Sequence, residues 1–165
     1  NTDKIGVWGS SAGGHLAMMV GCADEDTGME GDGGWEEYSS RVQAVCSFFG
    51  PSDLTSLFMP DGCCDFIGET LESRIDLYTA ASPINYVSAG DPPLLMIHGS
   101  ADYVVPYGQS EEMRRAYKDA GLDVELVRVV GAGHGFFPGD DFTPTVDEIE
   151  QKTLDFFAEY LLSEE

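Results

Sequence analysis

One short stretch near the start of the chain carries the residues best suited to covalent chemistry. Gly9-Ser10-Ser11-Ala12-Gly13 follows a short apolar run and precedes a series of good helix formers. A strand, a tight glycine-flanked turn and a helix in that order expose a serine hydroxyl on a strained turn. We expect glycine at positions 9 and 13 because side chains there would collide with neighbouring backbone. The pattern predicts a nucleophile at Ser11, although a plain glycine-rich turn in an α/β domain would give the same pentapeptide.

Two later loops carry the residue types that activate a serine. Asp102 follows a continuous apolar run at residues 93–98, and His134 lies in a glycine-rich loop after a second strand-like run. His134 would take the proton of the Ser11 hydroxyl, and Asp102 would hold the imidazole in the tautomer that permits this. Loops that follow successive parallel strands meet at one edge of a sheet. The sequence therefore predicts a triad of these three residues, working through an acyl-enzyme.

Other side chains near these loops are rivals for the same roles. His15 is expected to pack or to cap the helix that follows Ser11, and His98 to lie at the rim of the core. Asp53 is the main rival acid, although Ser52-Asp53 is also typical of a turn or a helix cap. Three aromatic residues are candidates for either an acyl pocket or the core: Trp8, Trp35 and Tyr107.

The elements that position these residues alternate between strands and helices. The predicted strands cover residues 4–8, 42–49, 93–98 and 124–130, and the main helices cover 12–22, 109–120 and 146–162. Residues 23–40 form a predicted loop, and a further helix is expected around 67–75. The last helix should bury one apolar stripe, made of Ile149, Leu154, Phe157 and Leu161. The alternation predicts an α/β fold with a mostly parallel sheet of about four strands, in a single domain over residues 1–165.

The charge of the chain limits the partners it can have. Thirty Asp and Glu residues stand against eight Lys and Arg, a formal net charge of -22. Binding to nucleic acid or to anionic lipid is excluded because both need a basic surface. No apolar run approaches the roughly 20 residues of a membrane span, and no signal-peptide pattern is visible, so the compartment stays open.

The cysteines and histidines give no support for a metal site. The four cysteines lack zinc-type spacing, and the three histidines are far apart. Cys46 lies in an apolar strand and is expected to be a buried small hydrophobe. Cys63 and Cys64 lie in a predicted loop, where either could pair with a distant cysteine, and the redox state stays open.

Taken together, these segments resemble the α/β-hydrolase esterase and lipase group, and most closely the BD-FAE-like carbohydrate esterases. The resemblance covers the chain nearly end to end and is carried by residues 5–17 (IGVWGSSAGGHLA), 45–54 (VCSFFGPSDL), 81–87 (ASPINYV), 91–106 (DPPLLMIHGSADYVVP) and 129–135 (VVGAGHG). It implies hydrolysis of small carboxylic esters, including acetyl or feruloyl groups on plant polysaccharide, with no metal or organic cofactor. It also implies a triad of Ser11, Asp102 and His134.

The chain departs from this family at its start. In the family, an earlier part of the chain supplies several strands and a His-Gly-Gly type loop, which gives an oxyanion donor. Here the N–H of Ala12 is one expected donor, and the second is missing. The strand from Ile5 to Trp8 would also form an exposed apolar edge. We therefore expect either a homodimer joined at that edge or a missing N-terminal segment.

Three functions follow from these patterns. The favoured one is a serine esterase that acts on small esters with short acyl groups. The others are a serine peptidase of the prolyl-oligopeptidase type, which shares the same loops, and a half-hydrolase that binds a partner without turnover.

The net charge of -22 yields a prediction about salt. Screening at molar ionic strength acts over about 3 Å, so added salt should relieve the repulsion between carboxylates in the folded chain. We expect the melting temperature to rise between low and molar NaCl, as followed by circular dichroism. No gain in stability with salt would exclude adaptation to a saline environment.

Overall fold

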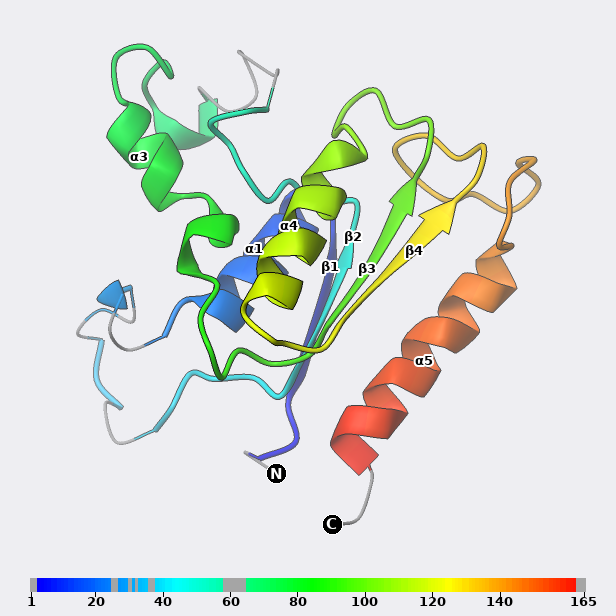
Figure 1. Ribbon diagram of the computed structural model, residues 1–165, viewed down its shortest axis with the longest axis horizontal. Coiled ribbons are helices and arrows are strands. Elements are labelled where there is room, and N and C mark those ends of the chain that lie inside the picture. Colours follow the sequence, from blue (N-terminus) through cyan, green and yellow to red (C-terminus); the bar gives the residue numbers. More distant parts are fainter. Residues whose placement is uncertain are drawn as a thin grey trace.

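A four-stranded parallel sheet lies at the centre of the fold (Figure 1). The computed structural model describes residues 3–24, 27–29, 31, 33–35, 38–57 and 65–162. Its strands follow one another across the sheet in sequence order: β1 (Gly6–Ser10), β2 (Ala44–Phe48), β3 (Leu94–Gly99) and β4 (Val124–Val129). The predicted α/β class and parallel sheet are confirmed, with strand ends within two residues of the expected ones.

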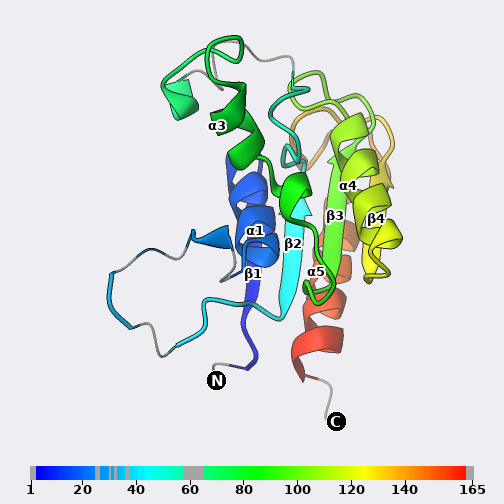
Figure 2. The ribbon, with the colours of Figure 1, turned by 60° about the vertical axis from the view of Figure 1, so that its left-hand side comes forward.

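Helices cover both faces of this sheet. Helices α1 (Ala12–Cys22) and α4 (Gly108–Asp119), with the short 3-10 helix η2 (Pro83–Tyr86), cover one face, and α5 (Val146–Leu162) covers the other (Figure 2). Successive strand residues point to opposite faces. Leu94 and Met96 therefore pack toward α1 and α4, whereas Leu95 and Ile97 pack toward α5. None of the helices in the described ranges is both long and apolar enough to cross a membrane.

Two sequence predictions about helices are wrong in detail. The helix expected over residues 67–75 is instead α3 (Ile75–Ala80), whose buried Tyr78 lies beyond the predicted range. In α5, Ile149 and Phe156 face the sheet, but Leu154 is 65% exposed. Leu154 precedes Phe157 by one helical turn, on the flank of α5 that lies over β1, and beyond β1 the described sheet ends.

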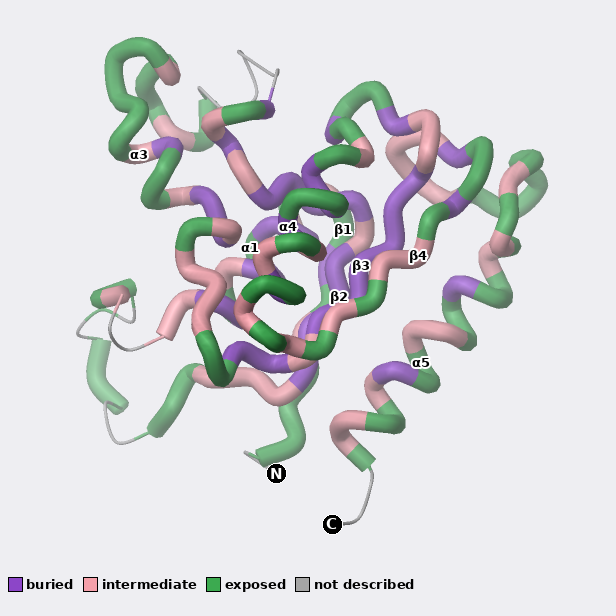
Figure 3. Tube along the Cα trace, viewed as in Figure 1, coloured by how far each residue is buried: buried purple, intermediate pink, exposed green. Residues whose placement is uncertain are grey.

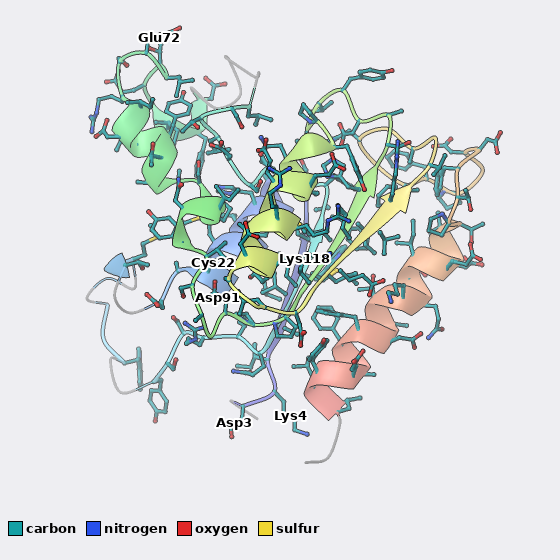
Figure 4. The ribbon with its side chains drawn as sticks, viewed as in Figure 1. Asp3, Lys4, Cys22, Glu72, Asp91 and Lys118 are labelled. Carbon is teal, nitrogen blue, oxygen red and sulfur yellow. The ribbon has the colours of Figure 1, made fainter. Side chains whose placement is uncertain are left out.

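The described cysteines are buried and unpaired. Burial raises the pKa of the Cys22 and Cys46 thiols to about 12, which makes both inert at neutral pH. Cys46 is thus the buried small residue that the sequence predicted. Cys22 ends α1 close to Asp91, as Figure 4 shows, and its sulfur lies 3.4 Å from the Tyr117 hydroxyl. Cys63 and Cys64, with their predicted option of pairing, lie outside the described residues.

The outer edge of β1 is open in the described part of the chain. β1 pairs with β2 on one side, and Ile5 and Trp8 are 44% and 55% exposed. Figure 3 shows the contrast between the exposed start of β1 and the buried strands β2 and β3. Apolar side chains are also exposed on helices to either side of this edge, namely Leu16 and Val20 on α1 and Leu154 on α5. The predicted apolar edge is therefore present.

Substitutions in α5 test which of its residues support the core. Phe156→Ala removes a ring packed against β3 and β4, and we expect a loss of about 3–5 kcal/mol in the free energy of unfolding. Leu154→Ala is the matched control on the same helix. It should change the free energy of unfolding by less than about 0.5 kcal/mol, because the Leu154 side chain is exposed. Urea denaturation measures both, and equal losses would contradict the observed orientation of α5.

Candidate active site

Ser11 lies on a strained turn between β1 and α1. Its φ and ψ angles of 54° and -120° place a non-glycine residue in the left-handed half of conformational space. The Ser11 N–H donates to the Phe48 carbonyl at 2.9 Å, which ties the turn to the end of β2. A Cβ on Gly9 would overlap the Gly13 carbonyl, so the expected need for glycine at 9 is confirmed. The same expectation is wrong for Gly13, where a Cβ would meet no described atom within 4 Å apart from the neighbouring backbone of its own helix.

The structure brings together the three side chains that the sequence singled out. Their loops follow β1, β3 and β4 and meet at the carboxyl edge of the sheet (Figure 1). Ser11 Oγ lies 2.8 Å from His134 Nε2, and His134 Nδ1 lies 2.7 Å from Asp102 Oδ2. A carboxylate only accepts hydrogen bonds, so Nδ1 carries the hydrogen and Nε2 accepts from the serine hydroxyl. This arrangement can remove the Ser11 proton when the oxygen attacks a carbonyl.

The Asp102 carboxylate is fixed on both of its oxygens. Oδ1 accepts hydrogen bonds from the N–H groups of Val104 and Val105 at 2.8 and 2.9 Å. Oδ2 faces His134, and the side chain is fully buried. Backbone donors on one oxygen leave the other free to orient the imidazole.

Aromatic rings pack around His134 at the end of β2. The ring of Phe49 stands edge-on to the His134 imidazole at a centroid distance of 4.8 Å, and Phe136 packs on Phe49 at 5.1 Å. Phe49 has a φ of 41°, and its N–H donates to the Ile97 carbonyl. Phe49 is not among the site residues predicted from the sequence. Its only signal is that Phe49 directly precedes Gly50-Pro51, a turn signature at the end of a strand.

The rival histidine and acid have structural roles. His15 is buried, and its Nε2 lies 2.6 Å from the Ala81 carbonyl, so it packs as predicted. Asp53 Oδ1 accepts from the N–H and hydroxyl of Thr55, which is the turn that the sequence allowed. His98 differs from the prediction of a rim residue, because it is fully buried.

The aromatic residues proposed for an acyl pocket or the core have different environments. Trp8 and Trp35 are 55% and 74% exposed, so neither belongs to the core. Tyr107 packs edge-on against the His98 imidazole, and the Arg128 guanidinium lies over its ring.

Helix α1 begins directly after Ser11. Ala12 is its first residue, and N–H groups in the first turn have no acceptor within their own helix. The N-terminal end of a helix also favours negative charge nearby. The N–H of Ala12 is thus suited to receive an oxyanion formed next to Ser11.

The fold is that of an α/β-hydrolase esterase. The chain belongs to the BD-FAE family, whose family model matches residues 1–117. It is 35% identical over 141 residues to Esterase LipQ of Mycobacterium tuberculosis, a match that covers 81% of this chain and 33% of LipQ. The chain therefore spans about a third of the length of this curated relative.

Solved structures show the same likeness. A truncated form of a carbohydrate esterase from gut microbiota aligns with a TM-score of 0.80 and 32% identity, over 96% of this chain and 60% of the other. The propionate-bound form of Est2, a thermophilic esterase from the Planctomycetes species Thermogutta terrifontis, aligns with a TM-score of 0.76 and 29% identity, over 99% of this chain and 59% of that chain. Both alignments cover nearly the whole of this chain.

The two glycines of the serine turn should respond differently to alanine. Gly9→Ala places a Cβ against the Gly13 carbonyl, and we expect a loss of about 1–3 kcal/mol in the free energy of unfolding. Gly13→Ala adds a methyl group in open space within the first turn of α1, where alanine is the better helix former by up to about 1 kcal/mol. Thermal melting should therefore shift in opposite directions, and a shift of the same sign would disprove the packing described.

Proposed function

We propose that this chain carries the catalytic machinery of a serine esterase that hydrolyses carboxylic esters with short acyl groups. The observation that carries the proposal is the unbroken hydrogen-bonded series from Ser11 through His134 to Asp102, with links of 2.8 and 2.7 Å. Membership in a family with esterase relatives supports the same reaction class. The triad roles are inferred from geometry and residue chemistry.

The proposed reaction runs in two halves. Ser11 Oγ attacks the ester carbonyl while His134 Nε2 takes its proton, and Asp102 stabilises the imidazolium that results. The Ala12 N–H and the N-terminal end of α1 stabilise the tetrahedral oxyanion. The intermediate collapses when the alcohol leaves with the proton from His134, and Ser11 retains the acyl group. Water then attacks this acyl-enzyme with His134 as base, which releases the acid and restores the serine.

We assign the acyl group to the short class, with acetyl esters of plant polysaccharide as the preferred natural substrates and feruloyl esters as the alternative. The solved relatives support this choice: one is named a carbohydrate esterase, and another is an esterase with propionate bound. The rings of Phe49 and Phe136 beside His134 give the site an apolar wall, which suits an uncharged acyl chain.

We also propose that the open edge of β1 is covered in the working enzyme by further polypeptide that brings a second oxyanion donor. Unpaired strand edges recruit other strands, and apolar residues lie exposed on both flanks of this one. The greater length of LipQ supports a partner within the same protein, and a second copy of the chain is the alternative. Loss of one oxyanion donor costs about a hundredfold to a thousandfold in turnover. The chain alone should therefore turn over slowly.

Hydrolysis by matched serine variants tests this function. The purified chain should hydrolyse p-nitrophenyl acetate and butyrate in preference to the corresponding amides. Ser11→Ala should abolish the activity, whereas Ser10→Ala, one residue earlier and on β1, should retain it. Light scattering on the same samples reports the mass of the active species.

Other outcomes of this assay would favour a different function. Equal rates in the wild-type chain and Ser11→Ala would contradict an active esterase and favour a half-hydrolase that binds without turnover. Faster cleavage of amides would favour a peptidase. A well-behaved monomer that is active at full rate would contradict the need for a partner at the β1 edge.

A further inference from the structure

His98 is a buried histidine that the proposed mechanism does not use. It lies near the end of β3 and points, like Leu94 and Met96, toward the α4 face of the sheet. Its side chain is fully buried, and burial lowers its pKa below the ordinary value for histidine. A buried histidine in an apolar strand costs stability unless its ring nitrogens are bonded, so its contacts show what it does there.

Both ring nitrogens of His98 have partners that fix its tautomer. Nε2 lies 2.9 Å from the Val105 carbonyl, which can only accept, so Nε2 carries the hydrogen. Nδ1 then accepts from the Ser110 hydroxyl on α4 at 2.7 Å. The neutral ring therefore connects β3, the loop at 102–105 and α4.

These contacts lead directly to the acid of the triad. Val105 bonds to both residues: its carbonyl accepts from His98, and its N–H donates to Asp102 Oδ1 at 2.9 Å. The hydrogen-bearing Nε2 also lies 3.3 Å from Asp102 Oδ2, the oxygen that faces His134. One carboxylate oxygen thus lies between two imidazoles, and His98 holds the turn that binds the other oxygen.

We infer that His98 is a positioning residue, whose neutral imidazole holds the 102–105 turn and the Asp102 carboxylate in the orientation that His134 requires. The inference rests on the proposed function, because it assigns a role relative to the triad. Charge is part of this role: a protonated His98 would pair with Asp102 and weaken its effect on His134. The groups that face the His98 ring are Asp102, Ser110, Tyr107 and the Val105 carbonyl, and His134 acts on its charge from the other side of Asp102.

Two amide substitutions of His98 test the contacts of Nε2 and of Nδ1 separately. The side-chain amide of Gln reaches about as far as Nε2 of histidine, whereas that of Asn reaches about as far as Nδ1. His98→Gln should therefore keep the N–H directed at Val105 and Asp102, and His98→Asn should lose it while it remains near Ser110. Ser110→Ala is a control that removes the Nδ1 partner, which does not contact Asp102.

Imidazole NMR of histidine-labelled protein provides a readout that does not depend on turnover. The chain has only three histidines, so the low-field signal of the His134 Nδ1 proton, bound to Asp102, can be assigned by substitution. We expect this signal to persist in His98→Gln and Ser110→Ala and to be lost in His98→Asn. In p-nitrophenyl acetate hydrolysis, His98→Asn should lower kcat by about tenfold to a hundredfold with KM little changed, the range for losing a hydrogen bond to a charged group.

Melting curves establish that each variant is folded. The inference is overturned if folded His98→Asn keeps the low-field signal and its kcat, or if the Asn and Gln variants behave alike. Failure of the proposed function has a different signature: the wild-type chain itself would then lack the signal, or Ser11→Ala would hydrolyse the ester as fast as wild type.

Discussion

The buried carboxylate of Asp102 is the group on which the geometry of the site depends. An unpaired charge in this position would be strongly unfavourable, and the structure offsets that cost with two backbone N–H donors and the imidazole of His134. The loops that carry these donors start directly at the ends of β3 and β4, so the strands fix where each donor lies. The positions of the strands thus fix the Asp102 carboxylate, and the carboxylate orients the His134 imidazole.

The sheet supplies the rigidity that this arrangement needs. β2 and β3 are covered on both faces by two separate apolar layers, so the ends of the strands cannot shift without disturbing one layer or the other. Two residues at the carboxyl edge, Ser11 and Phe49, take up left-handed backbone conformations. Hydrogen bonds from their N–H groups to Phe48 and Ile97 hold them to the neighbouring strands. Backbone strain of this kind persists only where the surrounding contacts hold the chain in that conformation.

Much of this organisation was predictable from the sequence, because it depends on local signals. Strand–glycine turn–helix order and three loops after apolar runs predicted which residues meet at the carboxyl edge. The residues whose environment differs from the sequence prediction depend on tertiary contacts. Leu154 has the spacing of a core residue but lies on the flank of α5 at the end of the described sheet. His98 and Phe49 have no motif of their own, and their roles follow from what the 102–105 turn and the end of β2 place beside them.

Covalent labelling by a fluorophosphonate tests whether Asp102 and His134 activate Ser11. Such a reagent reacts with an activated serine, and mass spectrometry of peptides locates the adduct. We expect one adduct per chain, on Ser11, and a labelling rate that falls by about ten thousandfold in Asp102→Asn, the size of effect known for this change in a serine protease. An adduct on Ser10 or elsewhere, or an unchanged rate in folded Asp102→Asn, would contradict it.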